Sequence, residues 1–152
     1  MNTILGILMD AFFIALLSWC AYTDIRTRTI SNVSVILLLC LGLAHTVLRI
    51  ISGSVWWSTP AGLALCIPFF IVWFKNVMGA GDVKLLAGIC LYLGLLNTLI
   101  SFVFMIPVLI VCMIYHRRKH GTIRSVIPFA PVLAVGAIGV TVMGYLYDLA
   151  CM

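Results

Sequence analysis

The stretch Met78-Gly79-Ala80-Gly81-Asp82-Val83-Lys84 is a short, partly polar segment between two long apolar runs. Its Asp82 is one of only four acidic residues in the chain, and all four are aspartates. The glycines at 79 and 81 allow the backbone to turn tightly or to approach another segment closely. A carboxylate placed after such a turn, at the mouth of an apolar segment, is a candidate for chemistry.

The composition around this stretch is that of a membrane protein. Hydrophobic residues make up 64% of the 152 residues and charged residues 9%, whereas a soluble domain is about half apolar and a quarter charged. The chain has room for about six spans of roughly 20 residues. We therefore expect an all-α, polytopic protein in which residues 1–152 form a single membrane-embedded domain.

The apolar runs and the polar breaks between them give the expected order of the spans. The first run has no basic residue before it and is interpreted as a transmembrane helix rather than a signal peptide. Pro68 is expected to kink the third span, and a turn is expected near Asn97 and Thr98. The expected spans are 3–23, 33–51, about 57–74, 82–96, about 99–115 and 128–147.

The basic residues divide unevenly between the two sides of such a bundle. One side holds only Arg49 of the 9 Lys and Arg residues. The other side holds the rest, namely Arg26, Arg28, Lys75, Lys84, Arg117, Arg118, Lys119 and Arg124. Because positive charge marks the cytoplasmic side, we expect Asp24 and Asp82 to lie together at the cytoplasmic surface of the cell membrane. The basic loop is attributed to topology and lipid headgroups, not to nucleic acid.

The other two aspartates do not share that depth. Asp10 precedes Asp24 by 14 residues on one helix, or roughly 21 Å, and Asp148 is near the opposite surface. We expect neither to be catalytic, although a carboxylate within a span usually faces a partner or water.

Asp24 and Asp82 each have a simpler structural explanation as well. Asp82 is well placed to cap the N-terminus of the following helix, which does not exclude catalysis. Asp24 lies at the C-terminal end of its helix, where the macrodipole disfavours negative charge, and pairing with Arg26 or Arg28 is the alternative to a catalytic role.

Two carboxylates that share one water are able to hydrolyse a peptide bond. They do not both ionise comfortably, so one keeps its proton and the other takes a proton from the attacking water. The protonated group polarises the carbonyl and later helps to protonate the leaving amine. This chemistry requires no metal and no cofactor.

Other catalytic or binding schemes have less support. The serines have no identifiable histidine at matching depth, and residues 79–82 lack the features of a phosphate-binding loop. The six cysteines form no C-x-x-C pair, so we interpret them as packing residues rather than zinc ligands or disulfides.

Three segments resemble motifs of the type IV prepilin leader peptidases, a family of GxGD aspartic proteases. Residues 79–86 are similar to the G-x-G-D-x-K segment, and residues 24–32 to an Asp followed by basic residues and Ile-Pro-Asn. Residues 127–131 resemble the I-P-F-x-P segment that begins the last helix of the family. The motifs occur in the family's order across essentially the whole chain.

The resemblance implies a six-helix membrane peptidase whose catalytic aspartates are Asp24 and Asp82. Its substrate would be a prepilin-like membrane protein with a short basic leader in the cytoplasm. Gly79 and Gly81 would bring Asp82 towards Asp24, Lys84 would bias the charge of Asp82 or anchor to lipid phosphate, and Pro128 and Pro131 would restrict the start of the last helix.

Two departures from the family pattern are visible. Ser31 stands where the family usually has proline. The chain also has no room for the cytoplasmic insert with two C-x-x-C pairs that long members carry. It is therefore similar to the short, cleavage-only members that serve tight-adherence (Flp) pili or archaeal-type flagellins, and we expect no methyltransferase activity.

Three alternatives remain open at this point. The chain could be a GxGD protease for a non-pilin substrate, or a small proton or cation transporter in which Asp10 acts. It could also be a non-enzymatic assembly factor that tolerates Asp24→Asn and Asp82→Asn.

Overall fold

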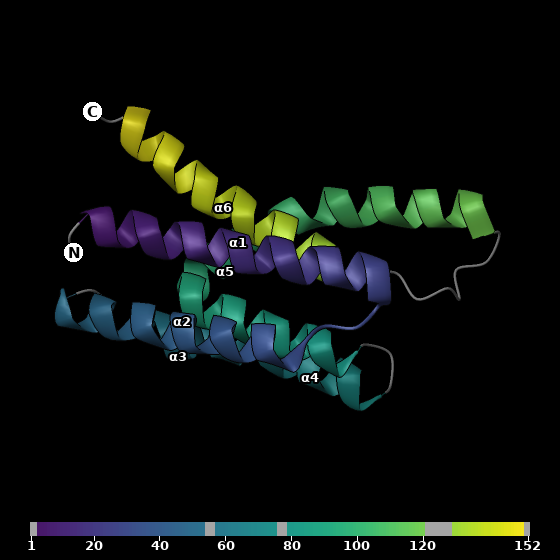
Figure 1. Ribbon diagram of the computed structural model, residues 1–152, viewed down its shortest axis with the longest axis horizontal. Helices are drawn as coiled ribbons and strands as arrows, with labels where there is room; N and C mark the ends of the chain where they lie inside the picture. The colour runs from purple at the N-terminus through teal and green to yellow at the C-terminus, as the bar shows by residue number, and fades with distance from the viewer. Residues whose placement is uncertain (1–2, 54–56, 76–78, 121–128, 151–152) are drawn as a thin grey trace.

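A computed structural model describes residues 3–53, 57–75, 79–120 and 129–150, and helices account for nearly all of them (Figure 1). The elements are α1 (Thr3–Thr27), α2 (Asn32–Ile51), α3 (Ser58–Ala64), α4 (Cys66–Phe74), α5 (Ala80–His120) and α6 (Ala130–Ala150). None of the residues in these described ranges is in a β-strand. The all-α prediction is therefore confirmed.

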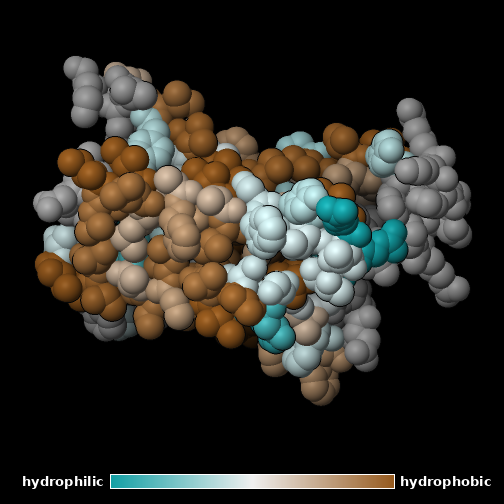
Figure 2. Space-filling view, in the orientation of Figure 1, coloured by the Kyte–Doolittle hydropathy of each residue, from teal (hydrophilic) through white to brown (hydrophobic). Residues whose placement is uncertain are grey.

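Within the described ranges, four helices are long and apolar enough to cross a membrane. They cover Ile4–Thr27, Asn32–Ile51, Ala80–Tyr115 and Ala130–Tyr147. Hydrophobic residues cover most of the face shown in Figure 2, and hydrophilic ones gather over the end of α1 and the start of α2. Since little of this apolar surface is buried within the bundle, a lipid environment is its natural solvent.

The segments run along the long axis of the bundle in alternating directions. The order is α1, α2, α3 with α4, the first part of α5, the second part of α5, and α6 (Figure 1). Helices α3 and α4 are short, with 7 and 9 residues, and the 41 residues of α5 are divided into two parts by non-helical backbone at Gly94. The expected count of about six spans therefore stays a prediction.

The reversal inside α5 occurs at Gly94, not at Asn97 and Thr98 as the sequence suggested. Gly94 has φ 75° and ψ −176°, whereas Asn97 and Thr98 lie within the helix that follows. Only glycine adopts this backbone region readily. A Cβ atom here would also lie 2.5 Å from the Ser58 hydroxyl oxygen, so close packing against α3 requires glycine too.

The break between α3 and α4 follows from Pro68. Proline has no N–H for the carbonyl four residues earlier, and its ring clashes with that carbonyl. The residue four positions before Pro68 is Ala64, at which α3 ends. The predicted kink in this segment is confirmed, and it takes the form of a break at Leu65.

Several other boundaries differ from the predicted ones. The first helix continues to Thr27, so Asp24 lies in a helical turn rather than at the start of a loop. Helix α5 begins at Ala80, which places Gly81 in its first turn instead of in the preceding loop, and it continues to His120. The last helix is described from Ala130 onwards.

The core runs along one face of each long helix. On α1 the buried face comprises Phe13, Leu17, Cys20 and Asp24, which are three or four residues apart. On α5 the corresponding face comprises Leu85, Leu86, Ile89, Cys90 and Leu93. Asp24 continues the first of these stripes, and Asp82 precedes the second by one turn, so both carboxylates lie where the two buried faces end.

Candidate functional site

Asp24 is buried at the end of α1 that lies far from both chain termini (Figure 1). Its exposed fraction is 7%, which is low for an aspartate near the end of a helix. The position follows from helical periodicity, because Asp24 comes four residues after the fully buried Cys20. A buried carboxylate requires hydrogen-bond donors from elsewhere in the fold.

The first residue of α6 supplies such a donor. The backbone N–H of Ala130 donates to Asp24 Oδ2 over 3.2 Å. The N–H groups of Val132 and Leu133 both donate to the Phe129 carbonyl, and Pro131 has no N–H. The Ala130 N–H is thus left for Asp24, and the positive end of α6 offsets the unfavourable dipole of α1.

Arg28 adds a charge on the other side of Asp24. The guanidinium of Arg28 lies close enough for an attractive electrostatic interaction with the carboxylate. Arg28 itself has φ 53°, and its N–H donates to the Asp24 carbonyl over 2.9 Å, which ends α1. Arg26 donates instead to the Tyr22 hydroxyl over 2.8 Å. Of the two arginines proposed as partners of Asp24, the structure selects Arg28.

Asp82 occupies the third position of α5. Gly79 precedes the helix, and its backbone N–H donates to the carboxylate of Asp82, while the Asp82 N–H donates to the Gly79 carbonyl over 3.2 Å. This reciprocal pattern is the acidic half of a capping box. The capping role predicted for Asp82 is confirmed, and it holds the side chain at the start of the helix.

The two carboxylates lie close enough to repel one another electrostatically. They come from α1 and α5, and the chain separates them by 58 positions. Like charges at short range favour a state in which only one of the two is ionised. A pair of carboxylates in which one keeps its proton has both an acid and a base available.

The two glycines of the predicted motif act in different ways. A Cβ atom on Gly79 would lie 3.2 Å from Asp82 Oδ2 and would crowd the carboxylate directly. A Cβ atom on Gly81 would lie 3.3 Å from Ile30, in the segment between α1 and α2. Gly81 therefore allows α5 to approach the loop that follows Asp24, as the sequence suggested.

The remaining motif residues have less direct roles. Lys84 has an exposed side chain, and the charged neighbour that acts on Asp82 is Asp24. Pro131 lies in the first turn of α6, where its missing N–H leaves Ala130 as the donor. Pro128 lies outside the described residues.

Ser31 keeps the backbone geometry that proline would impose. Its φ is −64° and its ψ is 128°, and proline fixes φ near −65°. The Ser31 carbonyl accepts from the Val35 N–H over 3.2 Å, which begins α2. The departure from the family pattern thus leaves the loop after Asp24 in a compatible conformation.

Asp10 is a separate feature, at the other end of α1. It accepts hydrogen bonds from the hydroxyls of Tyr92 on α5 and Tyr145 on α6. The two tyrosines were not singled out from sequence, where they resemble ordinary aromatic residues of an apolar span. The expectation that Asp10 faces polar partners within the bundle is confirmed.

Metal ligands do not converge among the described residues, where no group of three histidine, cysteine or acidic side chains comes together. Two of the described thiols, those of Cys66 and Cys90, contact each other, with their Sγ atoms 3.5 Å apart. The candidate site thus consists of carboxylates, backbone N–H groups and one guanidinium.

The fold and the site define a class of protein, namely a bundle of apolar helices with two adjacent aspartates at one end. Residues 11–116 match the model of the type IV leader peptidase family, which covers more than half of the chain. The chain therefore belongs to the type IV leader peptidase family, and this membership makes it a peptidase. The resemblance seen in the sequence motifs is confirmed.

The other two comparisons gave no match. Neither the curated proteins nor the solved structures include a significant match to this chain.

Proposed function

We propose that this protein is an aspartic endopeptidase that removes the short basic leader from type IV prepilin-like proteins. The observation that carries the proposal is the juxtaposition of Asp24 and Asp82 at one end of the bundle, in a chain that belongs to the leader peptidase family. Residues 1–152 act as a single membrane-embedded domain in this proposal, crossing the membrane about six times.

The proposed reaction uses one water between the two carboxylates. The ionised carboxylate takes a proton from the water, and the resulting hydroxide forms a bond to the carbonyl carbon of the scissile peptide. The protonated carboxyl donates its proton to the carbonyl oxygen. The tetrahedral intermediate then collapses: the carboxyl that took the proton from the water gives it to the nitrogen as the C–N bond breaks, and a hydroxyl of the intermediate returns a proton to the other carboxylate as the C=O bond re-forms. We assign neither role to a single residue, because the pair titrates as a unit.

The backbone N–H donors at the site support a reaction in which one carboxylate acts as the base and the other as the acid. The N–H of Ala130 fixes Asp24, and the N–H of Gly79 fixes Asp82, so neither carboxylate has to be oriented by the substrate. Such preorganisation keeps the reacting groups in place as charge moves between them.

The proposed orientation places the site at the cytoplasmic face of the cell membrane. The described basic residues Arg26, Arg28, Lys75 and Lys84 belong to segments at the end of the bundle that holds the two aspartates (Figure 1). The last turn of α2, which contains Arg49, is near the other end (Figure 1). A basic leader would stay in the cytoplasm for the same reason, and its cleavage would occur where the hydrophobic helix of the substrate leaves the membrane.

The proposal is tested by co-expressing a prepilin and following the loss of its leader as a gel shift. Wild type is compared with Asp24→Asn, Asp82→Asn and Asp10→Asn. Either of the first two changes abolishes processing in stably inserted protein, because Asn cannot exchange the proton. Asp10→Asn, the matched carboxylate control about 21 Å away, retains processing.

Two results would refute the proposal. Retention of full processing by both Asp24→Asn and Asp82→Asn would exclude the shared-water mechanism and would favour an assembly factor acting beside another protease. If the wild type cleaves none of the candidate prepilins, a different membrane substrate would instead be favoured.

The transporter alternative receives less support from the region around Asp10. Both oxygens of Asp10 already accept tyrosine hydroxyls, and Arg49 lines the same cavity. A guanidinium there repels a transported cation. Ion flux that disappears with Asp10→Asn in reconstituted vesicles would reverse this preference.

A further inference from the structure

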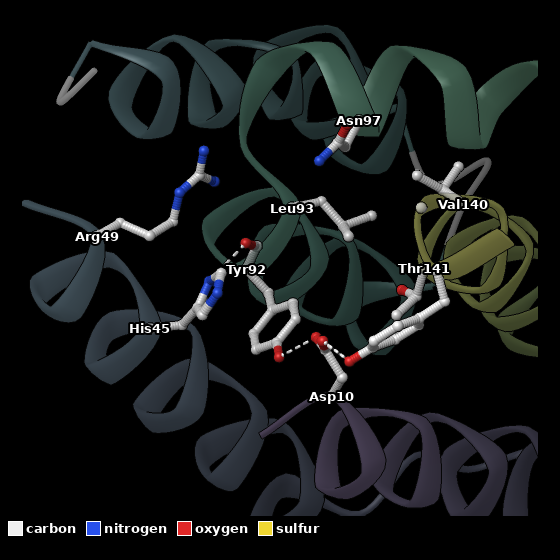
Figure 3. A pocket seen from close by; sticks show the side chains of 10 residues that line it. Asp10, His45, Arg49, Tyr92, Leu93, Asn97, Val140 and Thr141 are labelled. Carbon is white, nitrogen blue, oxygen red and sulfur yellow. Dashed lines mark hydrogen bonds between the residues drawn. The ribbon is translucent and has the colours of Figure 1, made fainter. Parts of the chain in front are cut away.

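A second polar site lies in the half of the bundle opposite to Asp24 and Asp82. A cavity of about 230 Å³ opens there between α1, α2, α5 and α6 (Figure 3). It is much larger than the roughly 30 Å³ that one water molecule occupies. Its polar lining comprises Asp10, His45, Arg49, Tyr92, Asn97, Thr141 and Tyr145.

One wall of this cavity is already complete in its hydrogen bonding. Tyr92 and Tyr145 donate to the two oxygens of Asp10. The ring of Tyr92 is stacked between the rings of Phe13 and His45, with centroid-to-centroid distances of 4.0 Å and 4.3 Å. His45 Nδ1 donates to the Tyr92 carbonyl over 3.0 Å. The carboxylate of Asp10 therefore already has two hydrogen-bond donors within the protein and does not need a ligand.

The opposite wall has donors that lack a protein acceptor. Arg49 on α2 and Asn97 on the second part of α5 extend towards the same space (Figure 3). Among the described residues, no acceptor is hydrogen-bonded to the guanidinium of Arg49, which is only partly exposed. A guanidinium carries five N–H donors and stays charged, so its unpaired burial in an apolar bundle is unfavourable.

The break at Gly94 lies beside the guanidinium of Arg49. The guanidinium lies next to Gly94, because a Cβ atom there would be 3.6 Å from one of its terminal nitrogens. The carbonyls of Leu91 and Tyr92, which the break frees, already accept from Thr46 and His45. Arg49 is thus left facing the cavity rather than capping these carbonyls.

The surroundings of Arg49 match the polar boundary of a bilayer. Arg49 is in the last turn of α2, two residues before the helix ends at Ile51. The two residues that follow Arg49 in α2, and Leu96 two positions after Gly94, are exposed apolar residues, with Ile50 51%, Ile51 77% and Leu96 71% exposed. A guanidinium that lines a polar cavity, on helices that also expose apolar side chains, suits a phosphate group whose hydrocarbon chains lie along the apolar surface.

We propose that the cavity beside Arg49 binds a phosphate group, supplied by the headgroup of a membrane phospholipid. Arg49 forms the paired N–H contacts to the phosphate oxygens, and the Asn97 amide donates a further hydrogen bond. Asp10 and its tyrosines form the opposite wall. The site is separate from the proposed peptidase centre and tethers α2 to the second part of α5 through a lipid.

The test measures lipid binding to purified full-length protein in an uncharged detergent. Short-chain phosphatidylglycerol, inorganic phosphate and an uncharged detergent of the same chain length are titrated separately, and the shift of the unfolding temperature gives the apparent affinity. The variants are Arg49→Gln, Arg49→Lys and Arg26→Gln. Arg26 is a matched control, since it is exposed and bonded to Tyr22 at the other end of the bundle.

The wild type and Arg26→Gln are expected to bind the phospholipid equally, and Arg49→Gln at least about 10-fold more weakly. Arg49→Lys, which keeps the charge but not the planar fork, falls between them and guards against a folding defect in Arg49→Gln. Protection by inorganic phosphate at similar concentrations would support the phosphate site but assign it to free phosphate. Equal protection of wild type and Arg49→Gln, or no protection of the wild type, would overturn the proposal.

Discussion

The carboxylate of Asp24, in the last two turns of α1, accepts a hydrogen bond of 3.2 Å from the backbone N–H of Ala130, the first residue of α6. The bond joins residues 106 positions apart in the chain. Its importance lies in the burial of Asp24, because a buried carboxylate at the negative end of its own helix needs compensation from another helix. The start of the last helix is thereby part of the candidate site.

Gly79→Ala is predicted to reduce leader processing by about 100-fold without unfolding the protein, because its Cβ atom would lie 3.2 Å from Asp82 Oδ2. Single-turnover cleavage of a prepilin in detergent measures the effect. Gly139→Ala is the matched control, since its Cβ atom meets Phe104 at 3.6 Å, an ordinary contact. Equal rates for the two variants would show that the position of Asp82 does not limit the reaction.

Gly81→Ala is predicted to have a smaller effect of the same kind. Its Cβ atom would meet the flexible side chain of Ile30 at 3.3 Å, so α5 shifts slightly from the loop that follows Asp24. The double change Gly81→Ala with Ile30→Ala is expected to recover part of the lost rate, because it removes the crowding. No recovery in the double variant would exclude Ile30 as the cause.

Gly94→Ala is predicted to lower the free energy of unfolding by more than the roughly 1–3 kcal/mol that a strained backbone position costs. The new methyl group would also collide with Ser58, at 2.5 Å. Gly53→Ala separates the two effects, because Gly53 has nearly the same φ, 77°, but no atom within 4 Å of its Cβ position. Thermal unfolding in detergent is the measurement, and equal losses for both variants would show that the contact with Ser58 contributes nothing.

Ser31→Pro is predicted to be tolerated and to raise the free energy of unfolding by about 0.4–1 kcal/mol, because Ser31 already has the φ of proline. Processing of the leader is expected to continue at the wild-type rate. Leu41→Pro, in the middle of α2, provides the contrast and should cost about 3 kcal/mol or more. A loss of activity in Ser31→Pro would mean that the N–H or hydroxyl of Ser31 has a role of its own.

Removal of divalent metals is predicted to leave processing unchanged, since the proposed reaction uses two carboxylates and a water. Prepilin cleavage is followed before and after treatment with a chelator that is then removed by dialysis. A loss of activity that added metal restores would replace the two-aspartate mechanism with a metal-assisted one.

The residues of the Asp24 motif and of the G-x-G-D motif lie at the same end of the bundle. The charge distribution and the G-x-G-D pattern predicted that Asp24 and Asp82 lie together and that Asp10 lies apart from them, because charged side chains are rare in apolar helices. The sequence predicted that Asp82 caps its own helix, but it did not indicate that Tyr92 and Tyr145 donate hydrogen bonds to Asp10. Tyrosines in an apolar span carry no periodic signal that separates a partner of a carboxylate from a packing residue.

By itself, the amino-acid sequence determined the all-helical class and the family and gave the prediction of two catalytic aspartates, because composition and local motifs depend only on nearby residues. The tertiary structure decided how Asp24 is stabilised, where α5 reverses and which cavity Arg49 faces. Each of these depends on contacts between segments far apart in the chain: Asp24 with Ala130, Gly94 with Ser58, and Arg49 with Gly94. Apolar helices share one composition on all their faces, so only their packing determines which side chains meet.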